Sequence, residues 1–156
     1  MDKILFRGKT QHDKWVYWNE YGELVGIGGK KRTTYEYRIA RNGISYYCYV
    51  HALRDSKLLL KNTIGRFTGL TDRNGKKIFE GDILKAITVD TNTERFAVVG
   101  FGEFEDENCG DTYIGFYIEF DTCKTTITQL SLDEVKDRFE VIGNIHNNPE
   151  LLEVKQ

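Results

Sequence analysis

The stretch FTGLTDRNGKKIFEGDILK, residues 67–85, decides the fold of this chain. Its Asn74-Gly75 pair stands between short apolar segments, and such a pair predicts a β-hairpin with a two-residue turn. Gly81-Asp82 then predicts a bend into the next strand, because glycine permits a positive φ and the Asp82 carboxylate can accept hydrogen bonds from nearby backbone amides. We therefore expect strands and sharp turns here.

Two ligand-binding interpretations of the same stretch fail on spacing. A phosphate-binding loop has the pattern G-x-x-x-x-G-K-[ST], whereas Gly69 and Gly75 lie six residues apart in this chain. A calcium loop that began at Asp72 would need an acid at its twelfth position, where the chain has Ile83. The spacing therefore favours a structural role over a phosphate or calcium site.

Segments rich in Tyr, Phe, Val, Ile and Thr predict strands on both sides of this stretch. Before it they are KILFRG (3–8), KWVYW (14–18), TTYEYRIA (33–40) and ISYYCYVH (44–51). After it they are ILKAITV (83–89), RFAVVGFGEF (95–104), YIGFYIEF (113–120), TTITQL (125–130) and RFEVIGNIH (138–146). HALRDSKLLLKN (51–62) has no clear helical period, and we expect a helical turn or linker there.

The later segments predict the fold class. Five strands at intervals of roughly 12 residues suit a small barrel or sandwich. Ser131 and Glu134 form a capping-box pattern for a helical turn at 131–137, and Asn148-Pro149 predicts a second helical turn in the tail. A helical turn before the last of five strands is the pattern of an SH3-like barrel.

We therefore expect a mainly β protein with few short helical turns, in which an N-terminal β unit precedes an SH3-like small β-barrel at about residues 64–146. The corresponding domains are an N-terminal β-rich region at 1–62 and the barrel with its C-terminal tail at 63–156. A single integrated domain is the alternative.

Composition points to a folded protein in a reducing compartment. The chain has 156 residues, of which 40% are hydrophobic and 13% aromatic, enough for a core of its own. No two of its three cysteines have the C-x-x-C spacing, so neither a disulfide framework nor a zinc ribbon is expected. No apolar window approaches the roughly 20 residues of a membrane helix. We expect a cytoplasmic protein with no membrane partner.

The net charge of −2 conceals an asymmetry. Residues 1–77 hold 16 Lys and Arg against 7 Asp and Glu, a charge of +9, and residues 78–156 hold 6 against 17, a charge of −11. Such a division marks either two surfaces with different roles or two halves that attract each other. Attraction within one molecule, attraction between molecules and a basic binding face all remain open.

The candidate catalytic carboxylates have no nucleophile or general base near them in the sequence. Glu80 and Asp82 could form a carboxylate pair, but no His, Cys or Ser is set beside them, and the acidic stretch EFEDENCGD (103–111) is typical of a solvated loop. The three histidines lie far apart in sequence, without the spacing of a zinc site. No nucleophile signature appears. We expect no catalytic residues, no metal and no cofactor.

A basic segment, KKRTTYEYRIAR (30–41), is the strongest candidate for a binding surface. Tyrosines beside cations can stack on bases and neutralise phosphates, while an exposed strand with tyrosines packed under long cations is the structural alternative. The candidate face for nucleic acid or an acidic partner consists of Lys30, Lys31, Arg32, Tyr35, Tyr37, Arg38 and Arg41.

Three motifs in order resemble the YopX-like family of phage and prophage proteins: ILFRGK (4–9) with WVYW (15–18), TIGRFTGLTDRNGKKIFEGDILK (63–85) and VIGNIHNNPELL (141–152). The resemblance implies a mostly β fold with an SH3-like barrel and a setting in the cytoplasm of a bacterial host. It implies no activity and no catalytic residues. The motif residues, all suited to turns, are Gly69, Asp72, Asn74, Gly75, Glu80, Gly81 and Asp82.

Three functional hypotheses follow. The first is a non-enzymatic accessory or binding protein that acts through contacts with another protein or through self-association. The alternative is a nucleic-acid-binding module that uses the basic 30–41 segment. The third is a metal-dependent hydrolase built from Glu80, Asp82 and the acids of 103–111.

Overall fold

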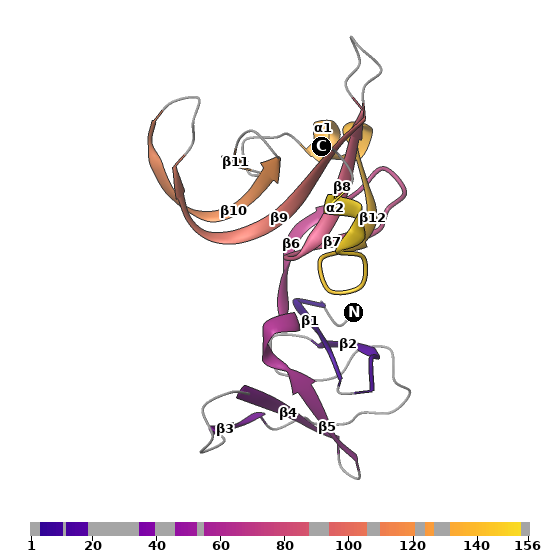
Figure 1. Ribbon diagram of the computed structural model, residues 1–156, viewed down its shortest axis with the longest axis vertical. Coiled ribbons are helices and arrows are strands. Elements are labelled where there is room, and N and C mark those ends of the chain that lie inside the picture. The colour runs from indigo at the N-terminus through magenta and orange to yellow at the C-terminus, as the bar shows by residue number, and fades with distance from the viewer. Residues whose placement is uncertain are drawn as a thin grey trace. The chain divides into compact units, whose positions relative to one another are not determined.

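A computed structural model describes residues 4–10, 12–18, 35–39, 46–52, 55–87, 94–105, 110–120, 124–126 and 132–153 (Figure 1). The chain divides into two compact units, Met1–Phe67 (unit 1) and Thr68–Gln156 (unit 2). Both are built from antiparallel strands, with two short α-helices in unit 2. The prediction of a mainly β protein is confirmed.

Unit 1 begins with a hairpin of β1 (Phe6–Lys9) and β2 (Trp15–Trp18), in which Phe6 lies opposite Trp18. The start of β6 (Gly65–Thr71) adds a third strand through pairing of Gly65 and Arg66 with β1. Alternate side chains of a strand point to opposite faces, so one face of this hairpin supplies the core. That core consists of Val16, Trp18 and Leu59, with Phe6 and Ile64 packed against them.

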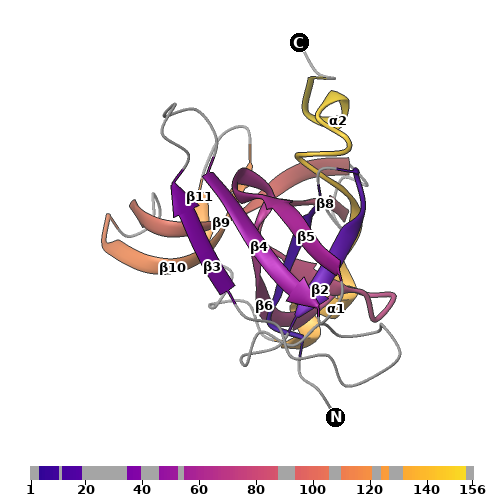
Figure 2. The same ribbon diagram turned by 90° about the horizontal axis from the view of Figure 1, so that it is seen from below.

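The second sheet of unit 1 contains β3 (Tyr35–Ile39), β4 (Tyr46–Ala52) and β5 (Asp55–Leu60) in sequence order, as Figure 2 shows. The expectation of a helical turn or linker over 51–62 is wrong, because most of it is strand, followed by the 3-10 helix η1 (Lys61–Thr63). Residues 58–60 pair with β4, and Leu59 is completely buried and bridges to Thr10. Pairing with a distant strand therefore determines the conformation of residues 58–60, which show no local periodicity.

Unit 2 contains a five-stranded sheet in the order β11-β10-β9-β8-β12. Its strands are β8 (Asp82–Ile87), β9 (Glu94–Glu105), β10 (Thr112–Phe120), β11 (Lys124–Thr126) and β12 (Phe139–Asn144). The helix α1 (Leu132–Arg138) directly precedes β12, and α2 (Glu150–Glu153) follows it. Each of the nine predicted strands overlaps a strand of the described residues, although 127–130 of the predicted 125–130 lie outside them. Strands β9 and β10 form a long curved hairpin (Figure 1).

The core of unit 2 lies on one face of this sheet. Its buried members are Ile78, Leu84, Ala97, Val99, Ile118, Val135, Phe139 and Val141. Ile78 comes from β7 (Lys77–Phe79), which pairs with β6, and Val135 comes from α1. In the described part of the chain the five strands keep two edges, β11 and β12, and no closed barrel is seen. The SH3-like barrel therefore stays a prediction.

Candidate functional site

The loop between β6 and β7 differs from the predicted two-residue turn. Asp72 N donates to Lys76 O (2.8 Å) and Gly75 N donates to Asp72 O (2.9 Å), which closes a three-residue loop. Gly75 has a φ of 78°, whereas Asn74 is not among the described residues with positive φ. A two-residue turn of the expected kind needs positive φ at both central positions, so the loop instead has the type I turn followed by a left-handed residue. The prediction of a two-residue turn is wrong.

Asp72 explains the longer loop, because its carboxylate accepts hydrogen bonds both from the loop and from β12. Oδ1 accepts hydrogen bonds from the backbone N–H groups of Asn74 (2.9 Å) and Lys76 (2.8 Å). Oδ2 accepts one from Val141 N (2.9 Å) in β12, 69 residues along the chain. Arg73 N also donates to Phe139 O (3.1 Å). The buried carboxylate of Asp72, 2% exposed, therefore joins the loop to the last strand.

The next turn repeats this arrangement around Asp82, whose side chain is 1% exposed. Asp82 Oδ2 accepts a hydrogen bond from Phe79 N (2.8 Å), and Gly81 has a φ of 82°. Gly81 N donates to Val99 O (2.8 Å), and Gly81 O accepts from Ile145 N (2.9 Å). The segments 72–76 and 80–82, here named the turn cluster, thus hold together β9, β12 and the chain beyond β12.

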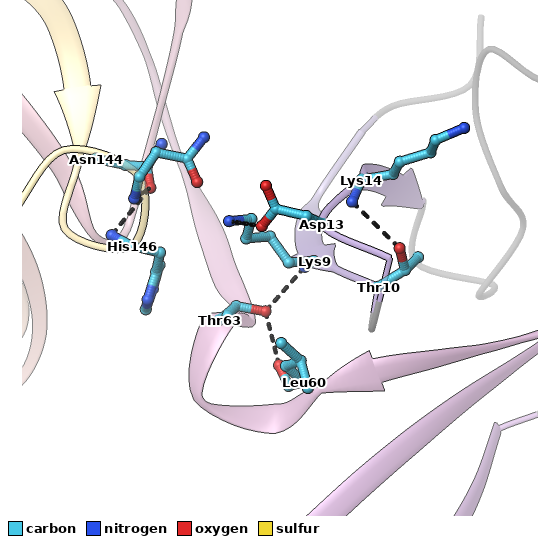
Figure 3. Close-up of polar contacts among 9 residues, drawn as sticks. Lys9, Thr10, Asp13, Lys14, Leu60, Thr63, Asn144 and His146 are labelled. Atoms are coloured by element: carbon cyan, nitrogen blue, oxygen red, sulfur yellow. Dashed lines mark hydrogen bonds and ion pairs between the residues drawn. The ribbon is translucent and has the colours of Figure 1, made fainter.

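The end of β12 is organised by a third side chain in the same way. Asn144 is buried, and its Oδ1 accepts hydrogen bonds from His146 N and Asn147 N, both at 3.1 Å; Figure 3 shows Asn144 and His146. Two of the motifs on which the family resemblance rests, 63–85 and 141–152, therefore contact each other through hydrogen bonds of Asp72 and Gly81. Their polar residues hold backbone in place.

A metal-dependent hydrolase would need Glu80, Asp82 and the acids of 103–111 to converge. Asp82 directs its carboxylate to its own turn, and Glu103, Glu105 and Asp111 are exposed. The described residues contain no group of three or more His, Cys, Asp or Glu side chains that could hold a metal ion. Residues 106–109 lie outside the described residues.

Most of the basic segment 30–41 also lies outside the described residues. Only the strand β3, residues 35–39, is described, and it pairs with β4. Tyr35 is opposite Val50 and Tyr37 is opposite Cys48 in this pairing. The proposed binding role of the segment stays a prediction.

A different group of cations and an aromatic ring occupies the non-core face of the β1–β2 hairpin. The guanidinium carbon of Arg7 lies 4.7 Å from the Trp15 ring centroid and Lys9 Nζ lies 5.9 Å from it. Lys9 pairs with Asp13, and its N–H donates to Thr63 Oγ1 (2.8 Å), as Figure 3 shows. Arg7 and Lys9 are both 6% exposed. Alternation within FRGK and WVYW could have indicated this face.

The part of the β9–β10 hairpin after Arg95, residues 96–123, is here named the acidic hairpin, and it extends the acidic stretch 103–111 on both sides. Residues 96–123 contain seven Asp and Glu and no Lys, Arg or His. On the face that continues from the core, Phe101 lies opposite Phe116 with ring centroids 4.9 Å apart, and Ile114 follows with 79% of its surface exposed. The hairpin thus combines an exposed apolar strip with one sign of charge.

The other face of the acidic hairpin is packed with aromatic rings over glycines. Phe104 lies 5.8 Å from Tyr113 and 5.1 Å from Tyr117 between ring centroids. A Cβ at Gly100 would clash with the Tyr117 ring, so glycine is required there for the ring to lie on the sheet. This packing keeps the end of the hairpin extended as two strands.

These features define a mainly β protein of two units whose buried polar motifs serve the fold. Residues 5–153 match the family model described as YopX protein, and the chain belongs to the YopX family. The resemblance predicted from the three motifs is confirmed.

The crystal structure of protein EF1440 from Enterococcus faecalis is similar over 97% of this chain and 99% of that chain, with 21% sequence identity and a TM-score of 0.47. No curated protein matches the chain. Within the described residues, no helix is long and apolar enough to cross a membrane.

Proposed function

We propose that this chain is a non-enzymatic accessory protein of a phage or prophage that acts in the cytoplasm of the bacterial host by binding another protein. The observation that carries the proposal is the acidic hairpin, where the exposed acids Glu103, Glu105 and Asp111 accompany the exposed side chains of Ile114 and Phe101, in a sequence (96–123) that holds no Lys, Arg or His. Apolar side chains within a field of one sign favour a protein partner of the opposite charge.

The use of the buried carboxylates supports a binding role over catalysis. Asp72 and Asp82 each accept backbone hydrogen bonds at the turns that contain them. Catalytic carboxylates instead face a substrate that they can reach. The turn cluster therefore supplies a rigid base, and the recognition surface lies elsewhere on unit 2.

The domain that presents this surface is, in our proposal, an SH3-like barrel at residues 63–156, after an N-terminal β-rich region at 1–62. The support is topological: β8, β9, β10 and β11 follow one another in the sheet, β12 returns to pair with β8, and α1 directly precedes β12. Small β-barrels commonly bind partners through a strand face and its loops.

The proposal is tested by using two forms of the full chain as bait in extracts of the bacterial host. One is the natural chain and the other is the triple variant Glu103→Gln, Glu105→Gln, Asp111→Asn, whose exposed acids lie on the acidic hairpin. We expect the natural chain to capture a basic protein that salt releases. When both proteins are purified, the affinity of this partner for the variant should be at least tenfold weaker than for the natural chain. Equal binding of both forms would contradict the proposal.

Self-association is the second form of protein contact, since residues 1–77 carry +9 and residues 78–156 carry −11. Sedimentation of the purified chain at low and high salt measures it directly. An oligomer that dissociates as salt increases supports head-to-tail attraction between copies. A monomer at every salt concentration leaves only a different protein as partner.

Nucleic-acid binding is the alternative, favoured by the basic 30–41 segment. It predicts quenching of tryptophan fluorescence by a single-stranded oligonucleotide, with affinity that falls steeply with salt. Charge reversal at Lys30, Lys31, Arg32, Arg38 and Arg41 should abolish that binding. Unchanged affinity in the reversed variant would remove this function.

A further inference from the structure

The outer edge of β12 is occupied by the loop between β6 and β7. Strand β12 ends the five-stranded sheet and has β8 as its neighbour on one side. On the other side Val141 N donates to Asp72 Oδ2 (2.9 Å), and Phe139 O accepts a hydrogen bond from Arg73 N (3.1 Å). Lys76 Nζ donates to Val141 O (3.3 Å). The β6–β7 loop therefore bonds backbone groups of β12 that a further strand would otherwise bond.

The spacing of these contacts is that of a strand ladder. Successive residues of a strand direct their backbone N–H and C=O groups to opposite edges, so every second residue faces a given neighbour. Phe139 and Val141 are two residues apart, and both are bonded to the loop. The Asp72 carboxylate thus takes the place of a backbone carbonyl of an added strand, and the N–H of Arg73 takes the place of a backbone donor.

Two further features restrict the same edge. Natural proteins protect exposed strand edges with lysine side chains and with bulges that interrupt the ladder. Lys76 supplies the lysine, and the register of β12 against β8 shifts between Val141 and Gly143. Three different devices therefore act on one short segment of the sheet. This argues for a role of the β6–β7 loop beyond the closure of its own hairpin.

An uncovered Val141 would be complementary to itself. Its N–H and its C=O both face the loop, which is the orientation of a residue in a hydrogen-bonded antiparallel pair. Two copies of β12 related by a two-fold axis at this residue would exchange both bonds between their Val141 residues. In that register Glu140 of one copy lies opposite Ile142 of the other, so within 139–143 no two like charges are directly opposite.

We propose that the β6–β7 loop is a cover that keeps β12 from pairing with β12 of a second copy of this chain, and that opening the loop joins the sheets of two copies edge to edge. The device lies within unit 2 and does not depend on the proposed partner of the acidic hairpin. It also differs from head-to-tail attraction between the halves of the chain. Residues 78–156 carry −11, so two such regions repel each other, and salt should strengthen this association instead of weakening it.

The variant Asp72→Thr opens the cover and keeps the loop closure. Its hydroxyl can accept a hydrogen bond from Lys76 N, as Thr10 Oγ1 does from Lys14 N in unit 1, whereas Val141 N loses its acceptor. In sedimentation at high salt, we expect the full-length variant to form a larger species as its concentration increases. The natural chain should sediment as one species under the same conditions. Equal association of the two chains at high salt would overturn the proposal.

A second variant, Val135→Ala, controls for loss of stability alone. Val135 lies in α1 and is completely buried in the core of unit 2, so its truncation leaves a cavity and keeps the hydrogen bonds of the loop. The free energies of unfolding of both variants are measured first, so that association is compared while each is folded. We expect Val135→Ala to sediment as the natural chain does. Association of both variants to the same extent would attribute it to unfolding and overturn the proposal.

Amide hydrogen exchange identifies the edge that pairs. In dilute Asp72→Thr the N–H of Val141 should exchange at least tenfold faster than in the natural chain, because it has lost its acceptor. In the concentrated variant, protection of this amide should return. Association without renewed protection of Val141 would exclude pairing through β12, and no association at any concentration would exclude the cover itself.

A proline tests the outward N–H group directly. Val141→Pro, added to Asp72→Thr, removes the N–H that faces the loop, and proline is tolerated on an edge strand where its nitrogen faces away from the neighbouring strand. We expect this double variant to lose the association that Asp72→Thr shows. Association that persists would overturn pairing through Val141. If the double variant does not fold, hydrogen exchange of Asp72→Thr alone decides the question.

Discussion

Two hairpin loops of this protein have the same backbone hydrogen bonds, but only one of them is also bonded to a distant strand. In unit 1 the chain returns from Thr10 to Lys14, with Thr10 N donating to Lys14 O (2.8 Å) and Asp13 N donating to Thr10 O (3.0 Å). In unit 2 it returns from Asp72 to Lys76 with the same two bonds, at 2.8 and 2.9 Å. Both loops reverse the direction of the chain within five residues and are closed by the same pair of backbone hydrogen bonds.

Their first residues also act alike. Thr10 Oγ1 accepts a hydrogen bond from Lys14 N (3.2 Å), and Asp72 Oδ1 accepts one from Lys76 N (2.8 Å). Asp72 has a second carboxylate oxygen, and this one accepts the N–H of Val141. The difference teaches that one extra oxygen converts a loop closure into a connection between distant strands.

The largest effect is expected when Asp72 is changed. Asp72→Ala removes the acceptor of three backbone N–H groups, that of Val141 in a buried hydrogen bond and those of Asn74 and Lys76 in part-buried ones. Leaving a buried donor unsatisfied costs about 1 to 3 kcal/mol. We expect a loss of about 3 to 5 kcal/mol in the free energy of unfolding of unit 2. Urea denaturation followed by far-UV circular dichroism measures this loss.

Asp72→Thr then isolates the second oxygen, because it gives unit 2 the closing residue that unit 1 has at Thr10. The hydroxyl can still accept from Lys76 N, whereas Val141 N loses its acceptor. We expect a loss of about 1 to 3 kcal/mol, smaller than that of Asp72→Ala, together with faster hydrogen exchange at Val141. Equal losses for the two variants would show that the Val141 contact contributes nothing.

The loops also differ at the residue with positive φ, which is Asp13 at 61° in unit 1 and Gly75 at 78° in unit 2. Gly75→Asp should destabilise unit 2 by about 1 kcal/mol, since a residue with a Cβ is strained in the left-handed region. A Cβ at Gly75 meets no atom within 4 Å, so the cost is conformational and not steric. A loss of stability far above about 1 kcal/mol would contradict this and would show that the new side chain meets a steric obstacle.

How far the sequence could predict these loops depends on the range of the contacts. The alternation in FRGK, WVYW and the later segments is local, and it predicted nine segments that each overlap a strand of the described residues. The Asn74-Gly75 pair indicated the right hairpin but the wrong turn, because the closing pair is set by Asp72, whose partner Val141 lies 69 residues away. Leu58–Leu60 was missed as a strand for the same reason, since its partners lie in β4.

The candidate binding surface was hidden for a related reason. The absence of cations from 96–123 is readable in the sequence. The exposure of Ile114 and the packing of Phe101 on Phe116 are not, because they follow from the register of β9 and β10. Strand register and length are set by pairing across the sheet, which a single segment does not encode.

The smallest effect is expected from the reverse exchange in unit 1, Asp13→Gly. The change removes the strain of a non-glycine residue at positive φ and should stabilise unit 1 by about 0.5 to 1 kcal/mol. The ion pair of Asp13 with Lys9 is lost, but the Asp13 side chain is 82% exposed, and such surface pairs contribute little. Both tryptophans, Trp15 and Trp18, lie in β2, so tryptophan fluorescence during urea denaturation reports this unit separately. If Asp13→Gly instead destabilises unit 1, the Lys9 contact matters more than the backbone strain, and the two loops are alike in hydrogen bonds but not in what stabilises them.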